Sequence, residues 1–158
     1  MEKNNMDLEN NINFEDGYKS FTINGDENRI IRFNPTDLSI VKRGKVATQE
    51  IDEYIKQMKK DIDEDDHIKS DAIMDQAELF IRNKINYIFG SDIAETAFGS
   101  QSTLSSLNGE PLFYRFLQPI LKLIETTTER EIKMSKEKLG KYETELNKYK
   151  TKEFLSNK

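Results

Sequence analysis

The residues with the clearest potential for chemistry form an acidic run, DIDEDDH, at positions 61–67. Three alternate carboxylates match the first three ligands of an EF-hand calcium loop: Asp61, Asp63 and Asp65. The sixth position of such a loop requires Gly, but here it holds Asp66. The twelfth requires a bidentate acid, but here it is Ala72. Because both diagnostic positions fail, we predict no metal site and interpret the run as a solvated loop between two helices.

The other residues that could act in catalysis are isolated from suitable partners. His67 is the only histidine, and a catalytic or metal-binding imidazole needs partners that orient it or share the ion. The chain has no cysteine, so it offers neither a thiolate nucleophile nor a disulfide. The serines at 100, 102, 105 and 106 lack a Gly-x-Ser-x-Gly context, and no Gly-Lys-Ser/Thr sequence forms a phosphate loop. We therefore predict a protein that is not an enzyme and uses no cofactor.

Composition narrows the classes of partner. The 158 residues include 24 Lys and Arg against 29 Asp and Glu, a net charge of -5, which argues against a nucleic-acid binder that must neutralise phosphates. No apolar run approaches the roughly 20 residues that span a bilayer, and the first residues lack the apolar segment of a signal peptide. We expect a protein partner, no nucleic acid, no membrane and a cytoplasmic location.

The elements that must position any binding surface are mainly helical. We predict an N-terminal β-hairpin packed on a small helical bundle, followed by a long charged C-terminal helix. The corresponding division is a flexible tail at 1–17, a hairpin and bundle domain at 18–125, and a charged helical arm at 126–158. The tail is rich in Asn, Asp and Glu, so it buries too little apolar surface to order itself.

The hairpin is predicted from two β-prone runs at 19–23 and 29–33 that flank a turn at 24–28. Asn24-Gly25 is a strong turn signal because both residues tolerate positive φ. Two helices should follow, one at about 35–62 capped by Asn34 and weakened or broken near Gly44, the other at about 70–89 and ended by Gly90. Residues 90–109 are predicted to be a loop that lies on the core through these apolar residues: Ile93, Ala97, Phe98, Leu104 and Leu107.

A third helix is predicted from Glu110-Pro111 onward, with a kink near Phe116 because Pro119 removes a backbone donor. It carries the most apolar face in the sequence, which fits the core of the bundle and also fits a surface that receives an apolar segment of a partner. The core interpretation is favoured for most positions. The candidate partner-binding residues are Phe98, Leu112, Phe113, Phe116, Leu117, Ile120, Leu121 and Ile124.

The arm alternates charge at four-residue steps from Glu129 to Glu145, which supports a helix through i,i+4 pairs. Four apolar residues follow the 3-4-3 spacing of a short coiled coil: Leu139, Tyr142, Leu146 and Tyr149. This seam could serve self-association or docking on a helical partner, and a solvated arm is the equally matched alternative.

Two segments together carry a resemblance. The first is Ile23-Asn24-Gly25 with Arg29-x-Ile31-Arg32-Phe33-Asn34-Pro35-Thr36-Asp37. The second is Ala97-Phe98-Gly99, Leu104-Ser105, Gly109-x-Pro111-Leu112-Phe113 and Phe116-Leu117. This pairing, within residues 18–125, resembles the tail assembly chaperones of tailed bacteriophages and prophages of Gram-positive bacteria, which are encoded beside the tape-measure protein.

The resemblance implies a protein that coats the long, helical, partly apolar tape-measure protein, keeps it soluble, recruits tail tube subunits and then leaves the virion. It also implies action in the host cytoplasm. Two alternatives stay open: a structural component of the tail or connector that remains in the particle, and a regulatory or anti-defence protein that binds a host factor.

Overall fold

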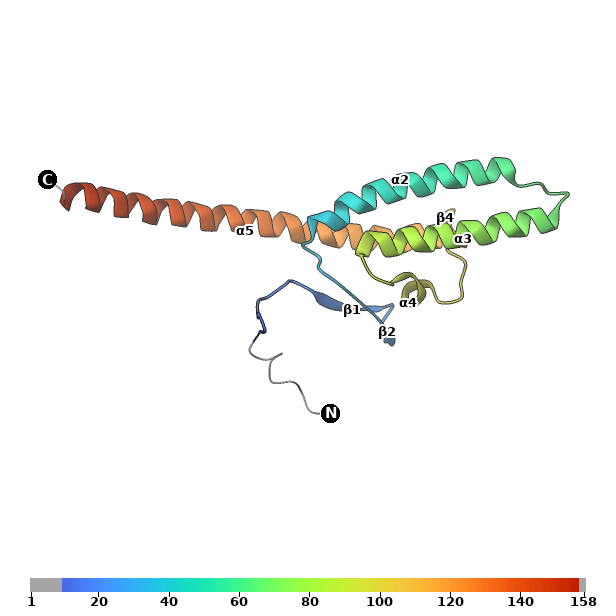
Figure 1. Cartoon of the computed structure of the whole chain (residues 1–158), viewed down its shortest axis with the longest axis horizontal. Coiled ribbons are helices and arrows are strands. Elements are labelled where there is room, and N and C mark those ends of the chain that lie inside the picture. Colours follow the sequence, from blue (N-terminus) through green and yellow to red (C-terminus); the bar gives the residue numbers. More distant parts are fainter. Residues whose placement is uncertain (1–9, 157–158) are drawn as a thin grey trace.

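The computed structural model describes the backbone of residues 10–156 and, within that range, the side chains of all residues except 142 and 149–156. The elements in chain order are β1 (Lys19–Ile23), β2 (Asp26–Phe33), α2 (Leu38–Asp61), α3 (His67–Phe89), α4 (Ala94–Phe98), β3 (Ser106–Leu107), β4 (Glu110–Pro111) and α5 (Leu112–Ser156). Figure 1 shows α2 and α3 as an antiparallel pair, with the first half of α5 beside them and its second half projecting away. The predicted fold class, an N-terminal hairpin with helices and a long C-terminal helix, is confirmed.

The hairpin is tighter than the sequence indicated. Asn24 and Gly25 both have positive φ, 52° and 73°, so two residues make the whole turn. The second strand therefore begins at Asp26, and the predicted turn at 24–28 was too long. The strands pair antiparallel with Phe21 opposite Ile31. Their apolar side packs on the helices, since Phe33 is buried and its ring lies 5.4 Å from that of Phe89.

Helix α2 begins three residues later than predicted. The cap is Asp37, whose Oδ1 accepts a hydrogen bond of 2.9 Å from the amide of Ser39. Asn34, the predicted cap, instead accepts from the amide of Thr36 at 2.9 Å. It therefore closes a turn that precedes the helix, and the amide of Asp37 completes this turn by donating to the carbonyl of Asn34.

The predicted break near Gly44 does not occur, because α2 is continuous there, and the local weakening of the helix stays a prediction. Gly44 is buried, and a Cβ at this position would lie 3.4 Å from Leu121 Cδ2 and 3.9 Å from Ile88 Cγ2. A methyl group would therefore make ordinary contacts here, whereas a larger side chain would meet α3 and α5.

Helix α3 starts at His67 because the side chain of Asp66 caps it, accepting from the amide of Lys69 at 3.0 Å. It ends as predicted at Gly90, which adopts the left-handed conformation with φ 67°.

Residues 90–111 are more ordered than the predicted loop, since they contain α4 and the short β3–β4 pair. The side chain of Asn86 accepts from the amides of Ile93 and Ala94, both at 2.8 Å, and so satisfies the start of α4. Arg29 donates to the carbonyls of Thr96 and Ala97 at the other end of α4. The segment lies on the core as expected.

Of the five apolar residues predicted to hold this segment on the core, Leu107 is the exception, being 57% exposed in β3. A two-residue strand at the surface turns its side chain away from the bundle.

The core draws on every layer of the molecule. It includes Ile31 and Phe33 of the hairpin, Ile51 of α2, and a buried row of α3. That row is Ala77, Ile81, Ile85, Ile88 and Phe89. Helix α5 begins at Leu112, after Pro111 in β4, and continues through Pro119. The kink near Phe116 stays a prediction. None of the helices described in residues 10–156 is both long and apolar enough to cross a membrane.

Candidate protein-binding groove

The apolar face of α5 divides into two sets of side chains. Phe113, Leu117 and Ile124 are at most 2% exposed and are surrounded by the core. Other residues of the chain already cover these side chains, so they are not available to a partner. Phe98 is also 2% exposed, but its ring lines the groove described next. The remaining candidates are partly buried at the edge of the core: Leu112, Phe116, Ile120 and Leu121.

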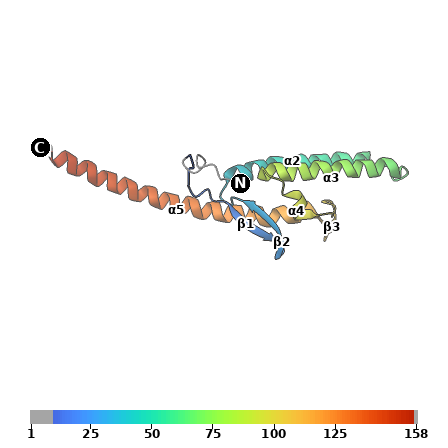
Figure 2. The same cartoon turned by 60° about the horizontal axis from the view of Figure 1, so that its bottom comes forward.

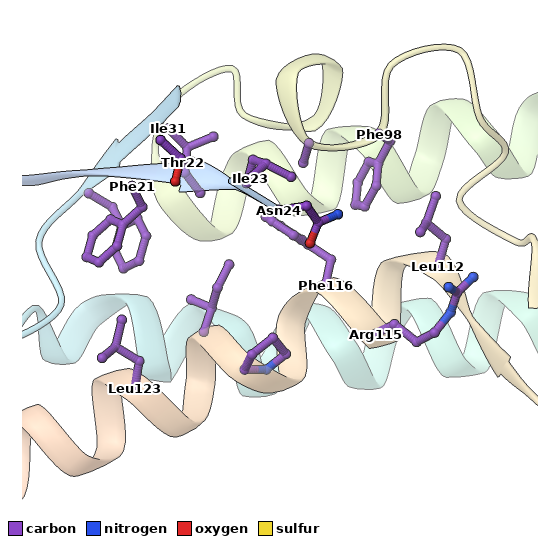
Figure 3. A pocket seen from close by; sticks show the side chains of 14 residues that line it. Phe21, Thr22, Ile23, Asn24, Ile31, Phe98, Leu112, Arg115, Phe116 and Leu123 are labelled. Atoms are coloured by element: carbon purple, nitrogen blue, oxygen red, sulfur yellow. The ribbon is translucent and has the colours of Figure 1, made fainter. Parts of the chain in front are cut away.

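Three of these four residues border a groove between the hairpin and α5, with a volume of about 390 Å³. Its wall on the hairpin side comes from Phe21, Thr22, Ile23 and Asn24. Its wall on the helix side comes from Leu112, Arg115, Phe116, Pro119, Ile120 and Leu123. Figure 3 shows the β1–β2 hairpin on one side and α5 on the other, with Phe98 beyond the hairpin turn at Asn24. A concave, mainly apolar site of this size is the usual form of a binding site.

The floor of the groove is held by aromatic contacts. The ring of Phe116 lies 5.1 Å from that of Phe98 in an edge-to-face arrangement and 6.2 Å from that of Phe89. On the hairpin side, Phe21 stacks on Phe33 with centroids 4.6 Å apart. Because each of these rings packs against a buried aromatic ring, the surface of the groove is largely preformed. Little side-chain entropy is therefore lost when a partner covers it.

The polar rim of the groove serves the fold. Arg115 donates to the carbonyl of Glu110 at 3.1 Å and to that of Ser105 at 2.8 Å. Its guanidinium thereby anchors the segment between α4 and α5 to the first turn of α5. The residues that line the groove include no carboxylate, histidine or cysteine. The groove therefore has the chemistry of an apolar docking surface and lacks an acid–base pair of its own.

Sequence reasoning found the helix side of the groove and missed the hairpin side. Phe21, Ile23 and Ile31 were recognised only as strand residues, because nothing in the sequence states which helix the hairpin crosses. Leu123 was missed because it lies off the most apolar stripe of α5. Leu121 was proposed for partner binding, but it does not line the groove and instead packs over Gly44.

The acidic run at 61–67 is used in a turn and a helix cap. Asp63 Oδ1 accepts from the amide of Asp65 at 3.0 Å, and Ser70 Oγ donates to the carbonyl of Asp63 at 2.7 Å. His67 is the first residue of α3 and is exposed. In the part of the chain that the structure describes, no group of three or more His, Cys, Asp or Glu residues is placed to hold a metal ion.

A partly buried polar cluster ties α3 to the loop after α4. The carboxylate of Glu78 accepts hydrogen bonds from the hydroxyls of Ser102 and Thr103, and Arg82 pairs with it at 3.4 Å. Burial by itself raises the pKa of Glu78. The hydrogen bonds from these three side chains and from the backbone of Thr103 outweigh this effect, so the pKa is lowered from 4.5. Because Thr103 is fully buried, the cluster holds the loop in place.

The predicted seam of the arm is only partly described. Leu139 and Leu146 are 61% and 57% exposed on α5. The side chains of Tyr142 and Tyr149 lie outside the described residues.

Comparisons with models of protein families, with curated proteins and with solved structures find no match to this chain.

Proposed function

We propose that this chain is a non-enzymatic binding protein that acts as a bacteriophage tail assembly chaperone, holding an apolar helical segment of the tape-measure protein in the groove between the hairpin and α5. The observation that carries the proposal is the groove itself, which is apolar, preformed and unfilled by the chain's own residues 10–148. The resemblance of residues 18–125 to tail assembly chaperones supplies the identity of the partner.

The shape of the groove supports a helical ligand. One wall is the side of a helix and the other is a two-stranded hairpin, so the groove runs along α5 from Leu112 to Leu123. A partner helix that lies along it would place residues at i, i+3, i+4 and i+7 against Phe116 and Ile120. An unassembled tape-measure protein exposes apolar helical segments of this kind, and covering them lowers its tendency to aggregate.

The surface outside the groove fits reversible coating. The chain carries a net charge of -5, so copies bound along one partner repel each other and resist aggregation. A groove of this size buries only a short row of partner side chains per copy, which is consistent with release when tail tube subunits arrive.

The test is co-expression with a candidate tape-measure protein, with the soluble fraction of that protein as the readout. Leu123→Glu places a charge in the groove at a position that is already 38% exposed, so it should abolish the solubilising effect while the chain still folds. Leu79→Glu is the matched control, since Leu79 is 63% exposed on α3 and does not line the groove.

Four results would contradict the proposal. The tape-measure protein could be equally soluble without this chain, or both leucine variants could behave alike. A stoichiometric amount of the chain in purified virions would instead favour a structural tail or connector component. Specific capture of a host protein through the same groove would favour the regulatory or anti-defence alternative.

A further inference from the structure

The second half of α5 is a helix without a cover. Beyond Thr128, every side chain that the structure describes, at 129–141 and 143–148, is exposed. Figures 1 and 2 show this part projecting from the body in both views. Helices in proteins owe most of their stability to packing of an apolar face. The arm is therefore suited to packing against a partner.

The exposed apolar residues of the arm continue the face that α5 buries in the core. Ile132, Leu139 and Leu146 recur every seven residues and are 48%, 61% and 57% exposed. Leu139 follows the buried Leu117, and Leu146 follows the buried Ile124, after about six full turns. One face thus runs along α5, covered by the hairpin and helices as far as Ile124 and open beyond it.

We propose that this open face is covered by the arm of a second copy of the chain, in an antiparallel two-stranded coiled coil. In the register proposed, Leu139 of one copy faces position 142 of the other, and Ser135 faces Leu146. The overlap of the two arms lies beyond Ile124, the last buried residue of α5.

Charge complementarity selects this register. The positions beside the seam are charged and exposed, and in this pairing Lys138 faces Glu145 of the second copy while Lys136 faces Glu143. Each pair occurs twice in the dimer because an antiparallel dimer is symmetric. A slide by one heptad sets Lys138 against Lys138 in one direction and Glu145 against Glu145 in the other. Like charges thus oppose both neighbouring registers.

A parallel pair agrees less well with the structure. In a parallel pair the two bodies would lie at the same end. There the hairpin and helices of each body already cover the face of α5 along which the second arm would have to pack. It would also place Ser135 against Ser135 in the seam, whereas the antiparallel pair places it against Leu146. The antiparallel arrangement sets the two bodies at opposite ends of the paired arms and leaves both grooves open.

Disulfide trapping tests the orientation, and the chain helps because it has no cysteine of its own. A mixture of Ser135→Cys and Leu146→Cys chains should give a mixed disulfide dimer under mild oxidation. Ser135→Cys alone should give little, since its two copies lie about 16 Å apart along the antiparallel pair. The matched control is Ser135→Cys mixed with Leu139→Cys, which pairs only in a shifted register. Efficient self-linkage of Ser135→Cys would overturn the proposal in favour of a parallel pair.

A charge exchange tests the register independently. Sedimentation of the full chain should show a dimer, and Lys138→Glu or Glu145→Lys should each weaken dimerisation about tenfold, because two attractive pairs become repulsive. The double variant should regain most of the affinity. In a parallel pair these residues face positions 143 and 150, so the double variant would be weaker than either single variant. A wild-type chain that stays monomeric at the highest soluble concentration, with a helical arm by circular dichroism, would also overturn the proposal.

Discussion

The two halves of α5 carry apolar residues on the same face, yet they lie in opposite environments. Phe113, Leu117 and Ile124 are enclosed by the bundle, whereas Ile132, Leu139 and Leu146 are exposed. The helix is continuous between them, so secondary structure does not mark the change. The comparison teaches that periodicity identifies the face of a helix to be covered and leaves open which element covers it. In the first half the covering is intramolecular, and in the second half we infer that it is a second copy.

The largest expected effect comes from truncating one residue in each half. Phe113→Ala should lower the free energy of unfolding by about 3–5 kcal/mol, because it leaves a cavity beneath the hairpin and helices. Leu139→Ala should change the stability of the monomer by less than about 0.5 kcal/mol. Urea unfolding at low protein concentration measures both. Equal losses for the two variants would mean that the arm is packed within its own chain.

The polar cluster of the body gives a second contrast, since Glu78 is held by three side chains whereas Glu137 of the arm is exposed. Glu78→Gln should cost about 1–3 kcal/mol at neutral pH, because the hydroxyls of Ser102 and Thr103 lose a charged acceptor. Glu137→Gln is the control and should cost almost nothing.

The pKa of Glu78 also fixes the sign of a pH effect. It is lowered in the folded chain, so the carboxylate contributes stability that is fully present above about 4.5, its usual pKa when unfolded. That contribution is lost as the pH falls through the lowered folded value. Urea midpoints measured from neutral to acidic pH should therefore fall less steeply for Glu78→Gln than for wild type. Parallel curves would show that the hydrogen bonds do not favour the charged form.

A third contrast uses the two helical glycines. Gly44→Leu should destabilise the body by about 1–3 kcal/mol, because its side chain would overlap Leu121 and Ile88 where three helices meet. Gly140→Leu should be tolerated, since nothing lies within 4 Å of a Cβ there. Thermal unfolding followed by circular dichroism compares the two. A tolerated Gly44→Leu would mean that α2 can move away from α5 at little cost.

Whether a feature could be predicted from the sequence depends on whether neighbouring residues determine it. The hairpin turn at Asn24-Gly25, the helix end at Gly90 and the apolar stripe of α5 depend on neighbouring residues, and all were identified. The cap of α2 was misplaced because both Asn34 and Asp37 suit a helix start, and only the turn between them decides.

Only the helix side of the groove could be predicted from the sequence, and the reason differs from that for the cap of α2. The wall formed by Phe21 and Ile23 depends on where the hairpin crosses α5, which is a long-range contact with no local signature. The contacts of Gly44 could not be predicted for the same reason, since its neighbours Ile88 and Leu121 are distant in the sequence. Local rules give only the cost of a glycine within a helix, whereas the room for a side chain at position 44 depends on the packing of three helices.

The smallest expected effect separates a folded arm from one that folds on pairing. Gly140→Ala replaces the poorest ordinary helix former in the middle of the arm and should stabilise it by about 0.5–1 kcal/mol. If the arm is a stable helix by itself, the helical signal of the wild type is already complete and the variant adds nothing to it. If helix formation is coupled to pairing, the variant should raise helicity at low concentration and strengthen dimerisation a few-fold. Because position 140 lies off the seam, any gain in dimerisation must come from helix stability alone. Circular dichroism across a dilution series, with Gly44→Ala as the control within the body, makes that distinction.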